Sequence, residues 1–158
     1  PNLEMIFNDS GNNKAIVEYI QESLRKNLNV DIQLSAMTFQ ERIQRMKQKD
    51  FDLVLAGWSG DFKDAITYLD LFVTNGGNNY GSYSNPKYDE LLRKIKSTSD
   101  QSVRVPAMIE LEKIIAEDMP VGLLYNRKQT KIINPRVKDI GFNPIGKDYL
   151  LDKTYIQK

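Results

Sequence analysis

The chain has 158 residues, 41% of them hydrophobic and 27% charged, which is typical of one ordinary globular domain and unlike disordered or membrane-spanning proteins. Its formal net charge of +1 and its scattered lysines and arginines give no electrostatic footprint for nucleic acid, so we expect no nucleic-acid partner. Because it has neither Cys nor His, it lacks a thiolate nucleophile and the usual general base near neutral pH, and we expect a protein that is not an enzyme and has no catalytic residue, metal site or cofactor.

The first third of the chain alternates between strand and helix patterns. Residues 3–7 form a short apolar run, which predicts a strand. Residues 13–28 repeat apolar side chains every four positions, which predicts a helix with one buried face. Residues 30–37 then alternate apolar and polar side chains, the pattern of a half-buried strand.

A second helix and a third strand follow. Thr38 and Glu41 have the spacing of a capping box and mark the start of the helix, and the apolar residues 51–58 predict the strand. This order favours the α/β fold class, with a mixed sheet and flanking helices. Ligands of open α/β sheets bind beyond the carboxyl ends of the strands, so residues 57–61 lie where a site is expected.

Helices and one long loop are predicted next. Residues 65–73 have a helical pattern, and residues 74–86 form a loop rich in Gly, Asn, Ser and Tyr. A loop of that length is usually either functional or disordered. Two further helices are predicted, one from Pro86 and one over residues 102–118, where Pro106 marks either the start of the helix or a kink.

The remainder of the chain is predicted as strand and loop. Residues 121–126 and 130–135 are apolar runs joined by a basic turn, which predicts two strands. Residues 141–158 are predicted as a loop-rich tail. Because no internal repeat or low-complexity segment interrupts the chain, we expect residues 1–158 to form a single lobe.

The segment at the end of the third predicted strand has the residue types of a binding site. Gly57 and Gly60 let a ligand approach the main chain closely, and Trp58 offers a large flat apolar surface. Asp61 is suited to hold a cation such as an ammonium group. The main-chain groups of Ser59 and Gly60 can add hydrogen bonds as in strand addition, so the segment predicts recognition of an amine end and an amide backbone.

Other interpretations of these residues remain open at this point. A single Trp at a strand end is more often a core residue than a ligand platform, and Asp61 is also suited to cap a turn or helix. Asp61 and Asp64 are a possible carboxylate pair of a hydrolase, although their spacing implies no third group. Tyr80 and Tyr83 could stack on bases or sugars, but the loop that holds them has no basic residue.

The order of features along the chain resembles the peptide-binding subunits of ABC transporters, the extracytoplasmic solute-binding proteins of the oligopeptide and dipeptide type in family 5. The similarity keeps its order over nearly the whole chain. The resemblance implies one lobe of a type II periplasmic-binding-protein-like fold, in which two lobes close around the ligand. It rests on four stretches, DSGNNKAIVEYIQESLRKNLNVDIQL (9–34), FDLVLAGWSGDF (51–62), YSNPKYDELLRKI (83–95) and IELEKIIAEDMPVGLLYN (109–126).

The resemblance also implies a site and its partners. The Trp-x-x-Asp stretch of the family matches Trp58 and Asp61, and implies that the aspartate pairs with the α-amino group of a peptide. It gives the main chain of Ser59 and Gly60 the role of bonding an extended peptide. The implied partners are a peptide ligand, the permease subunits of the transporter and the remaining lobe of the same protein. The implied location is extracytoplasmic, in the periplasm or at the cell surface as a membrane-anchored lipoprotein.

One feature bears on the length of the peptide ligand, and another on which part of a longer protein the chain forms. Some relatives have a basic residue three places before this Trp that helps hold the peptide carboxylate, whereas this chain has Leu55, which favours longer peptides. The chain begins at Pro1 with a strand already under way, so we expect a piece of a longer protein, and the resemblance implies that this piece is the C-terminal lobe. Because some family members bind other solutes, a lobe for a metal complex or a sugar is the alternative.

Overall fold

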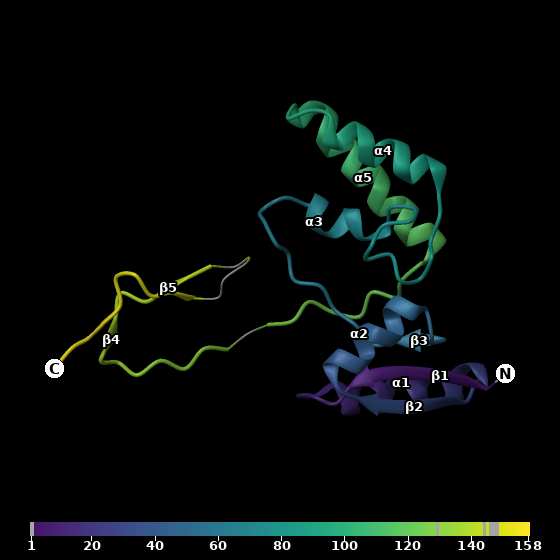
Figure 1. The fold of residues 1–158 in the computed structure, drawn as a ribbon, viewed down its shortest axis with the longest axis horizontal. Helices are drawn as coiled ribbons and strands as arrows, with labels where there is room; N and C mark the ends of the chain where they lie inside the picture. The colour runs from purple at the N-terminus through teal and green to yellow at the C-terminus, as the bar shows by residue number, and fades with distance from the viewer. Residues whose placement is uncertain (1, 129, 144, 146–148) are drawn as a thin grey trace. The chain divides into compact units, whose positions relative to one another are not determined.

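The computed structural model describes residues 2–128, 130–143, 145 and 149–158. The chain divides into two compact units, residues 1–58 and residues 59–158, which are described separately (Figure 1). Among the described residues, no helix is both long and apolar enough to cross a lipid bilayer.

The first unit has a sheet with two crossover helices, as the alternating sequence pattern predicts, but its strands are all parallel and not mixed. The strand order is β2-β1-β3, so the first strand is central and the other two lie at the edges. Parallel neighbours must be joined by a crossover, and α1 and α2 provide the two crossovers. The elements are β1 (Leu3–Asn8), α1 (Asn13–Leu28), β2 (Ile32–Met37), α2 (Phe39–Gln48) and β3 (Leu53–Val54).

Each helix of the first unit covers a different face of β1. Met5 and Phe7 point to one face, where they pack with Val17 of α1 in a buried cluster. Because successive side chains of a strand alternate, Glu4 points to the opposite face. There its carboxylate forms an ion pair with Arg45 of α2, with a shortest distance of 2.6 Å between Oε2 and Nη2. The core of this unit therefore lies mainly between α1 and the sheet.

The predicted capping box of α2 is confirmed. The N–H of Glu41 donates to Thr38 Oγ1 at 3.2 Å, and the N–H of Thr38 donates to Glu41 Oε2 at 2.8 Å. The third strand is shorter than the predicted 51–58, because only Leu53 and Val54 pair in register with β1. Residues 56–59 are exposed, so the chain leaves the sheet soon after it begins to pair.

The second unit contains the three predicted helical segments. Its helices are α3 (Ile66–Leu69), the 3-10 helix η1 (Asp70–Phe72), α4 (Pro86–Lys96) and α5 (Gln101–Asp118). Of the two alternatives for Pro106, the start of the last helix is wrong, because α5 begins at Gln101 and contains Pro106 in its interior. The start is fixed by Asp100, whose carboxylate accepts a hydrogen bond from the N–H of Ser102. The helix continues through Pro106 to Asp118, although Pro106 has no N–H to donate to the carbonyl four residues earlier.

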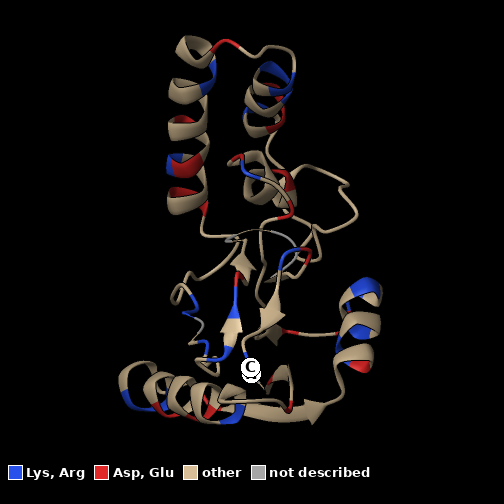
Figure 2. Ribbon diagram, turned by 90° about the vertical axis from the view of Figure 1, so that its left-hand side faces the viewer, with Lys and Arg blue, Asp and Glu red and all other residues tan. Residues whose placement is uncertain are grey.

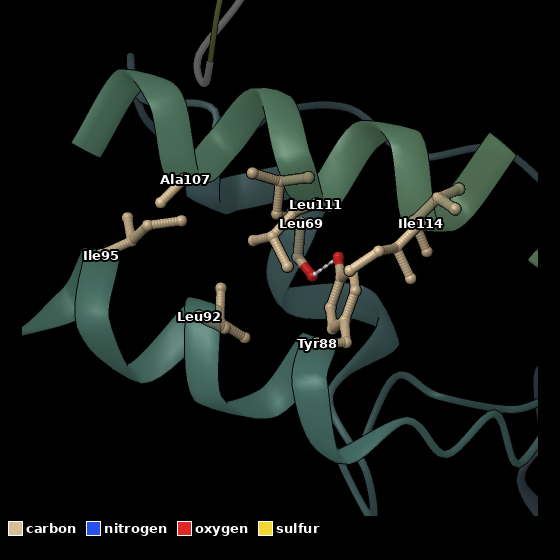
Figure 3. Packing of buried hydrophobic residues seen from close by; sticks show 8 residues of the cluster. Leu69, Tyr88, Leu92, Ile95, Ala107, Leu111 and Ile114 are labelled. Atoms are coloured by element: carbon tan, nitrogen blue, oxygen red, sulfur yellow. Dashed lines mark hydrogen bonds between the residues drawn. The ribbon is translucent and has the colours of Figure 1, made fainter. Parts of the chain in front are cut away.

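A cluster of buried apolar side chains holds the helices of the second unit together (Figure 3). Helices α4 and α5 lie side by side, and α3 packs against them through Leu69. The hydroxyl of Tyr88, which is fully buried, donates a 2.7 Å hydrogen bond to the carbonyl oxygen of Leu69. Both helices carry acidic and basic residues (Figure 2), and in α4 the acidic Asp89 lies in the first turn and basic residues lie in the last turn. The buried cluster consists of Leu69, Tyr88, Leu92, Ile95, Ala107, Leu111, Ile114 and Ile115.

The prediction of strands over residues 121–126 and 130–135 is wrong, because the described residues of both runs are irregular. A strand needs a partner for its main-chain groups, and these apolar runs find none in the described chain. Leu123 is 83% exposed and Ile132 is 97% exposed, so their apolar pattern is not matched by burial. The basic turn predicted between the runs includes residue 129, which lies outside the described residues.

Short antiparallel pairs follow, in sheets separate from the parallel one. The predicted loop-rich stretch 141–158 contributes β5, β6 and β7, and its residues 144 and 146–148 lie outside the described residues. The single-lobe assignment of residues 1–158 stays a prediction. The pairs are β4 (Val137–Lys138) with β7 (Tyr155–Ile156), and β5 (Gly141–Phe142) with β6 (Tyr149–Leu150).

Candidate ligand-binding site

The end of β3 is held in place by main-chain hydrogen bonds at Leu55. Its N–H donates to the carbonyl of Ile6 at 3.0 Å, and its own carbonyl accepts a 2.5 Å hydrogen bond from Nη1 of the buried Arg42. The Leu55 side chain is buried in the core of the first unit. The chain therefore leaves the sheet from a fixed point, and position 55 presents no side chain to a ligand.

Trp58 is the last residue of the first unit. Its side chain is 40% exposed, and it belongs to neither of the buried clusters among the described residues. The interpretation of this Trp as a core residue is therefore not supported. Within its own unit, Trp58 offers an aromatic surface to solvent, as a ligand platform requires.

Gly60 and Asp61 form a corner whose main chain is fixed by two side chains of α3. The N–H of Gly60 donates to the hydroxyl of Tyr68 at 3.1 Å, and the N–H of Asp61 donates to Thr67 Oγ1 at 2.9 Å. Gly60 is buried, and a Cβ atom built on it would lie 3.0 Å from the Tyr68 hydroxyl and 3.2 Å from Thr67 Cγ2. The corner therefore has little room for a side chain at position 60.

The carboxylate of Asp61 is exposed to solvent and, in the part of the chain that the structure describes, makes no hydrogen bond or ion pair. Its neighbour Asp64 differs in both respects. One oxygen of Asp64 accepts a 3.0 Å hydrogen bond from the N–H of Ile66, and the other pairs with Arg104. The carboxylate that bonds the N–H at the start of α3 is thus that of Asp64 and not that of Asp61, and the carboxylate of Asp61 is available to a cation.

Arg104 connects the start of α3 to the end of α4. Its buried guanidinium donates through Nη2 to Asp64, and through Nη1 to the carbonyls of Ile95 at 3.0 Å and Thr98 at 3.3 Å. The carboxylate of Asp64 is engaged in this network, so of this pair only Asp61 has an available carboxylate. A hydrolase of the kind considered for Asp61 and Asp64 needs two. Among the described residues, no cluster of three or more acidic side chains is arranged to hold a metal ion.

The long loop over residues 74–86 is an ordered series of turns around one buried side chain. The amide of Asn79 donates to the carbonyls of Val73 and Tyr83, at 3.0 and 2.7 Å, and accepts from the N–H of Tyr83 at 3.0 Å. The hydroxyl of Tyr83 donates to Asp118 at the end of α5, 2.5 Å away. Burial, and then this hydrogen bond, raises the pKa of Tyr83 to about 12.

The four predicted site residues are consecutive in the sequence, and the boundary between the two units falls among them. Trp58 ends the first unit, and the second begins with Ser59, Gly60 and Asp61. The sequence did not indicate Thr67 and Tyr68, which hold the corner through their hydroxyl groups. The residue type of Thr67 was the available signal, because threonine side chains often bond nearby main-chain groups, whereas no sequence pattern indicates that Tyr68 bonds Gly60.

Three comparisons with known proteins bear on these residues. A family model described as bacterial extracellular solute-binding proteins, family 5 Middle, matches residues 1–80. The oligopeptide-binding protein OppA of Bacillus subtilis is 29% identical over 150 residues, a region that covers 94% of this chain and 28% of that protein.

Solved structures agree with the sequence relatives. The substrate-binding domain of an oligopeptide ABC transporter from Bacillus anthracis has a TM-score of 0.91 at 28% identity, covering 99% of this chain and 31% of that one. OppA of Listeria monocytogenes bound to peptide has a TM-score of 0.85 at 35% identity, covering 100% of this chain and 30% of that one. The predicted fold class is confirmed. The chain spans less than a third of the length of each of these proteins.

Proposed function

Because the chain belongs to the bacterial extracellular solute-binding proteins of family 5, we propose that it is one lobe of the peptide-binding subunit of an ABC importer. The complete protein would capture extracellular oligopeptides and deliver them to the permease subunits. The names of its relatives support this function: OppA of Bacillus subtilis is an oligopeptide-binding protein, and the Listeria structure has a peptide bound. The family is extracellular by its description, and a lipoprotein anchor at the cell surface is part of the proposal.

The α-amino group of the peptide would be bound by Asp61. The supporting observation is that this carboxylate is exposed and unengaged by described residues, while its main chain is fixed by the hydrogen bond to Thr67. A carboxylate and an ammonium group form a charge-assisted hydrogen bond, which is stronger than one between neutral groups. This bond requires a free amine, so it selects the amino terminus of a peptide.

The peptide main chain would be bound by Ser59 and Gly60. The N–H of Gly60 already donates to Tyr68, so Gly60 would contribute its carbonyl group, whereas Ser59 would contribute both its main-chain groups. Trp58 would provide an apolar wall beside them. Since the side chain at position 55 is a buried leucine, no basic group there holds a peptide carboxylate, and we expect longer peptides to be the ligands.

The proposal is tested by calorimetric titration of the full-length protein, because one lobe alone supplies only part of the contacts. The ligand is a synthetic oligopeptide with a free amino terminus, compared with its N-acetylated form. We expect Asp61→Asn and N-acetylation each to weaken binding by ~1.5–3 kcal/mol, about 10–150-fold, the range for a hydrogen bond to a charged group.

Asp31→Asn is the matched control. Asp31 is also an exposed aspartate, but it precedes β2 and so lies toward the amino end of a strand, away from the edge where ligands of α/β sheets bind. We expect its affinity to equal that of the wild-type protein. If neither Asp61→Asn nor acetylation changes the affinity, the role of Asp61 is wrong. If no oligopeptide binds, the peptide function itself is wrong.

A further inference from the structure

The orientation of Asp61, the candidate receptor for the amine, depends on the residues that hold its main chain, and its role as receptor rests on the proposed function. We propose that Thr67 and Tyr68 are positioning residues, which hold Gly60 and Asp61 so that the carboxylate of Asp61 meets the amino group of a peptide. Neither residue needs to contact the ligand. They act through the main chain of the corner.

The two hydroxyl groups form a clamp on consecutive main-chain N–H groups. Thr67 and Tyr68 are adjacent in α3, and they accept hydrogen bonds from the N–H groups of Asp61 and Gly60 respectively, at 2.9 and 3.1 Å. Thr67 is buried, whereas the ring of Tyr68 is half-exposed. Two bonds to successive residues fix both the position and the direction of this stretch of main chain, which one bond would not do.

The helix that carries the clamp is itself anchored at both ends. At its start, the N–H of Ile66 donates to Asp64, which Arg104 holds. At its end, the carbonyl of Leu69 accepts from the buried hydroxyl of Tyr88. A site is accurate only when the groups around its binding residues are themselves fixed. The hydroxyls of Thr67 and Tyr68 therefore hold the main chain of Asp61 in a fixed position relative to the helical core.

A positioning role makes a specific prediction about ligand preference. If the clamp orients Asp61, its loss weakens the bond to the amine and leaves the other peptide contacts unchanged. The measurable quantity is the ratio of two dissociation constants, for an N-acetylated oligopeptide and for the same peptide with a free amine. A residue with a merely structural role would weaken the binding of both peptides together.

The experiment uses the full-length protein with Thr67→Val and Tyr68→Phe, each of which removes one hydroxyl and keeps the shape of the side chain. We expect each variant to bind the free-amine peptide roughly threefold to tenfold more weakly, as expected for one lost hydrogen bond, with the acetylated peptide unaffected. Thr67→Ser retains the hydroxyl and should restore the wild-type ratio. Tyr155→Phe, in the exposed strand β7, is the matched tyrosine control and should leave the ratio unchanged.

Three results would contradict the proposal, and they are distinguishable. If the wild-type protein binds both peptides equally, Asp61 is not an amine receptor and the proposed function of the site fails first. If the wild-type protein prefers the free amine and both variants keep the full preference, the clamp does not position Asp61. If both peptides lose affinity equally, the role is structural. Thermal unfolding of each variant, monitored by circular dichroism, establishes that the folded protein is being compared.

Discussion

The hydroxyl of Tyr88 lies 2.7 Å from the carbonyl oxygen of Leu69 and joins the first turn of α4 to the end of α3 (Figure 3). Helix α3 has only four residues, too few to be stable without tertiary contacts. Its position, and with it that of Thr67 and Tyr68, depends on such contacts. The bond lies inside the core of the second unit, where water cannot replace it.

Replacing Tyr88 by Phe should therefore destabilise the protein. The ring still fills its place, but the hydrogen bond to the carbonyl of Leu69 is lost, and one intramolecular hydrogen bond contributes about 0.5–1.5 kcal/mol to stability. Urea denaturation should show a lower free energy of unfolding by this amount. The control is Tyr125→Phe, since Tyr125 is exposed and its loss of a hydroxyl should have no measurable effect. Equal stability of the wild-type protein and Tyr88→Phe would contradict the prediction.

The ion pair of Glu4 with Arg45 should make the first unit sensitive to acid. The hydrogen bond from Arg45, assisted by Ser35, lowers the pKa of Glu4 from 4.5 to about 2. A carboxylate with a lowered pKa in the folded state stabilises the fold above its unfolded pKa, and this contribution is lost as the pH falls from 4.5 toward 2. Since the pair is partly exposed, we expect a contribution of about 1 kcal/mol.

The check is the pH dependence of unfolding, followed by circular dichroism. Glu4→Gln should be less stable than the wild-type protein at pH 7, and the difference should shrink through the same acidic range. Glu22→Gln is the control, because Glu22 pairs with Arg25 within one exposed turn of helix α1. Its stability should follow that of the wild-type protein. A constant difference between Glu4→Gln and the wild-type protein at all pH values would count against the pKa assignment.

Two glycines near the candidate site should respond oppositely to replacement by alanine. At Gly60 a Cβ atom would lie 3.0 Å from the Tyr68 hydroxyl, so the tyrosine must shift and its hydrogen bond weaken, and we expect a loss of about 1 kcal/mol. At Gly57 a Cβ atom meets no heavy atom within 4 Å. There alanine should be neutral or stabilising by about 0.5 kcal/mol, because it restricts the unfolded chain. Thermal unfolding of both variants tests this, and equal destabilisation would contradict it.

Local features of the fold could be predicted from the sequence, because they depend on residues close together in the chain. The capping box of Thr38 and Glu41 and the helix over residues 13–28 are such features. The helix predicted over residues 102–118 is confirmed as α5, and of the two alternatives for Pro106 only the helix start is wrong, because the Asp100 cap sets the start at Gln101. Strands were wrongly predicted at residues 121–126 and 130–135, because an apolar pattern in the sequence does not show whether a partner strand is present.

The candidate site was predictable in outline only. Asp61 was indicated by its type and by its place after a strand, and the structure leaves its carboxylate exposed. The network that supports it was not predictable, because it joins distant parts of the chain: Asp64 meets Arg104 forty residues later. No local pattern encodes such a pairing. Thr67 and Tyr68 were assigned to a helix, but sequence periodicity does not show which loop atoms a helical hydroxyl contacts.

The hydrogen bonds from Gly60 and Asp61 to α3 also bear on the speed of binding. Both N–H groups have their acceptors within the second unit, so this corner is assembled before a ligand arrives. If Asp61 binds the amino terminus as proposed, a peptide would not have to wait for the loop to order itself. Differences in affinity among peptides should then appear mainly in how fast each one dissociates, with similar association rates for all of them.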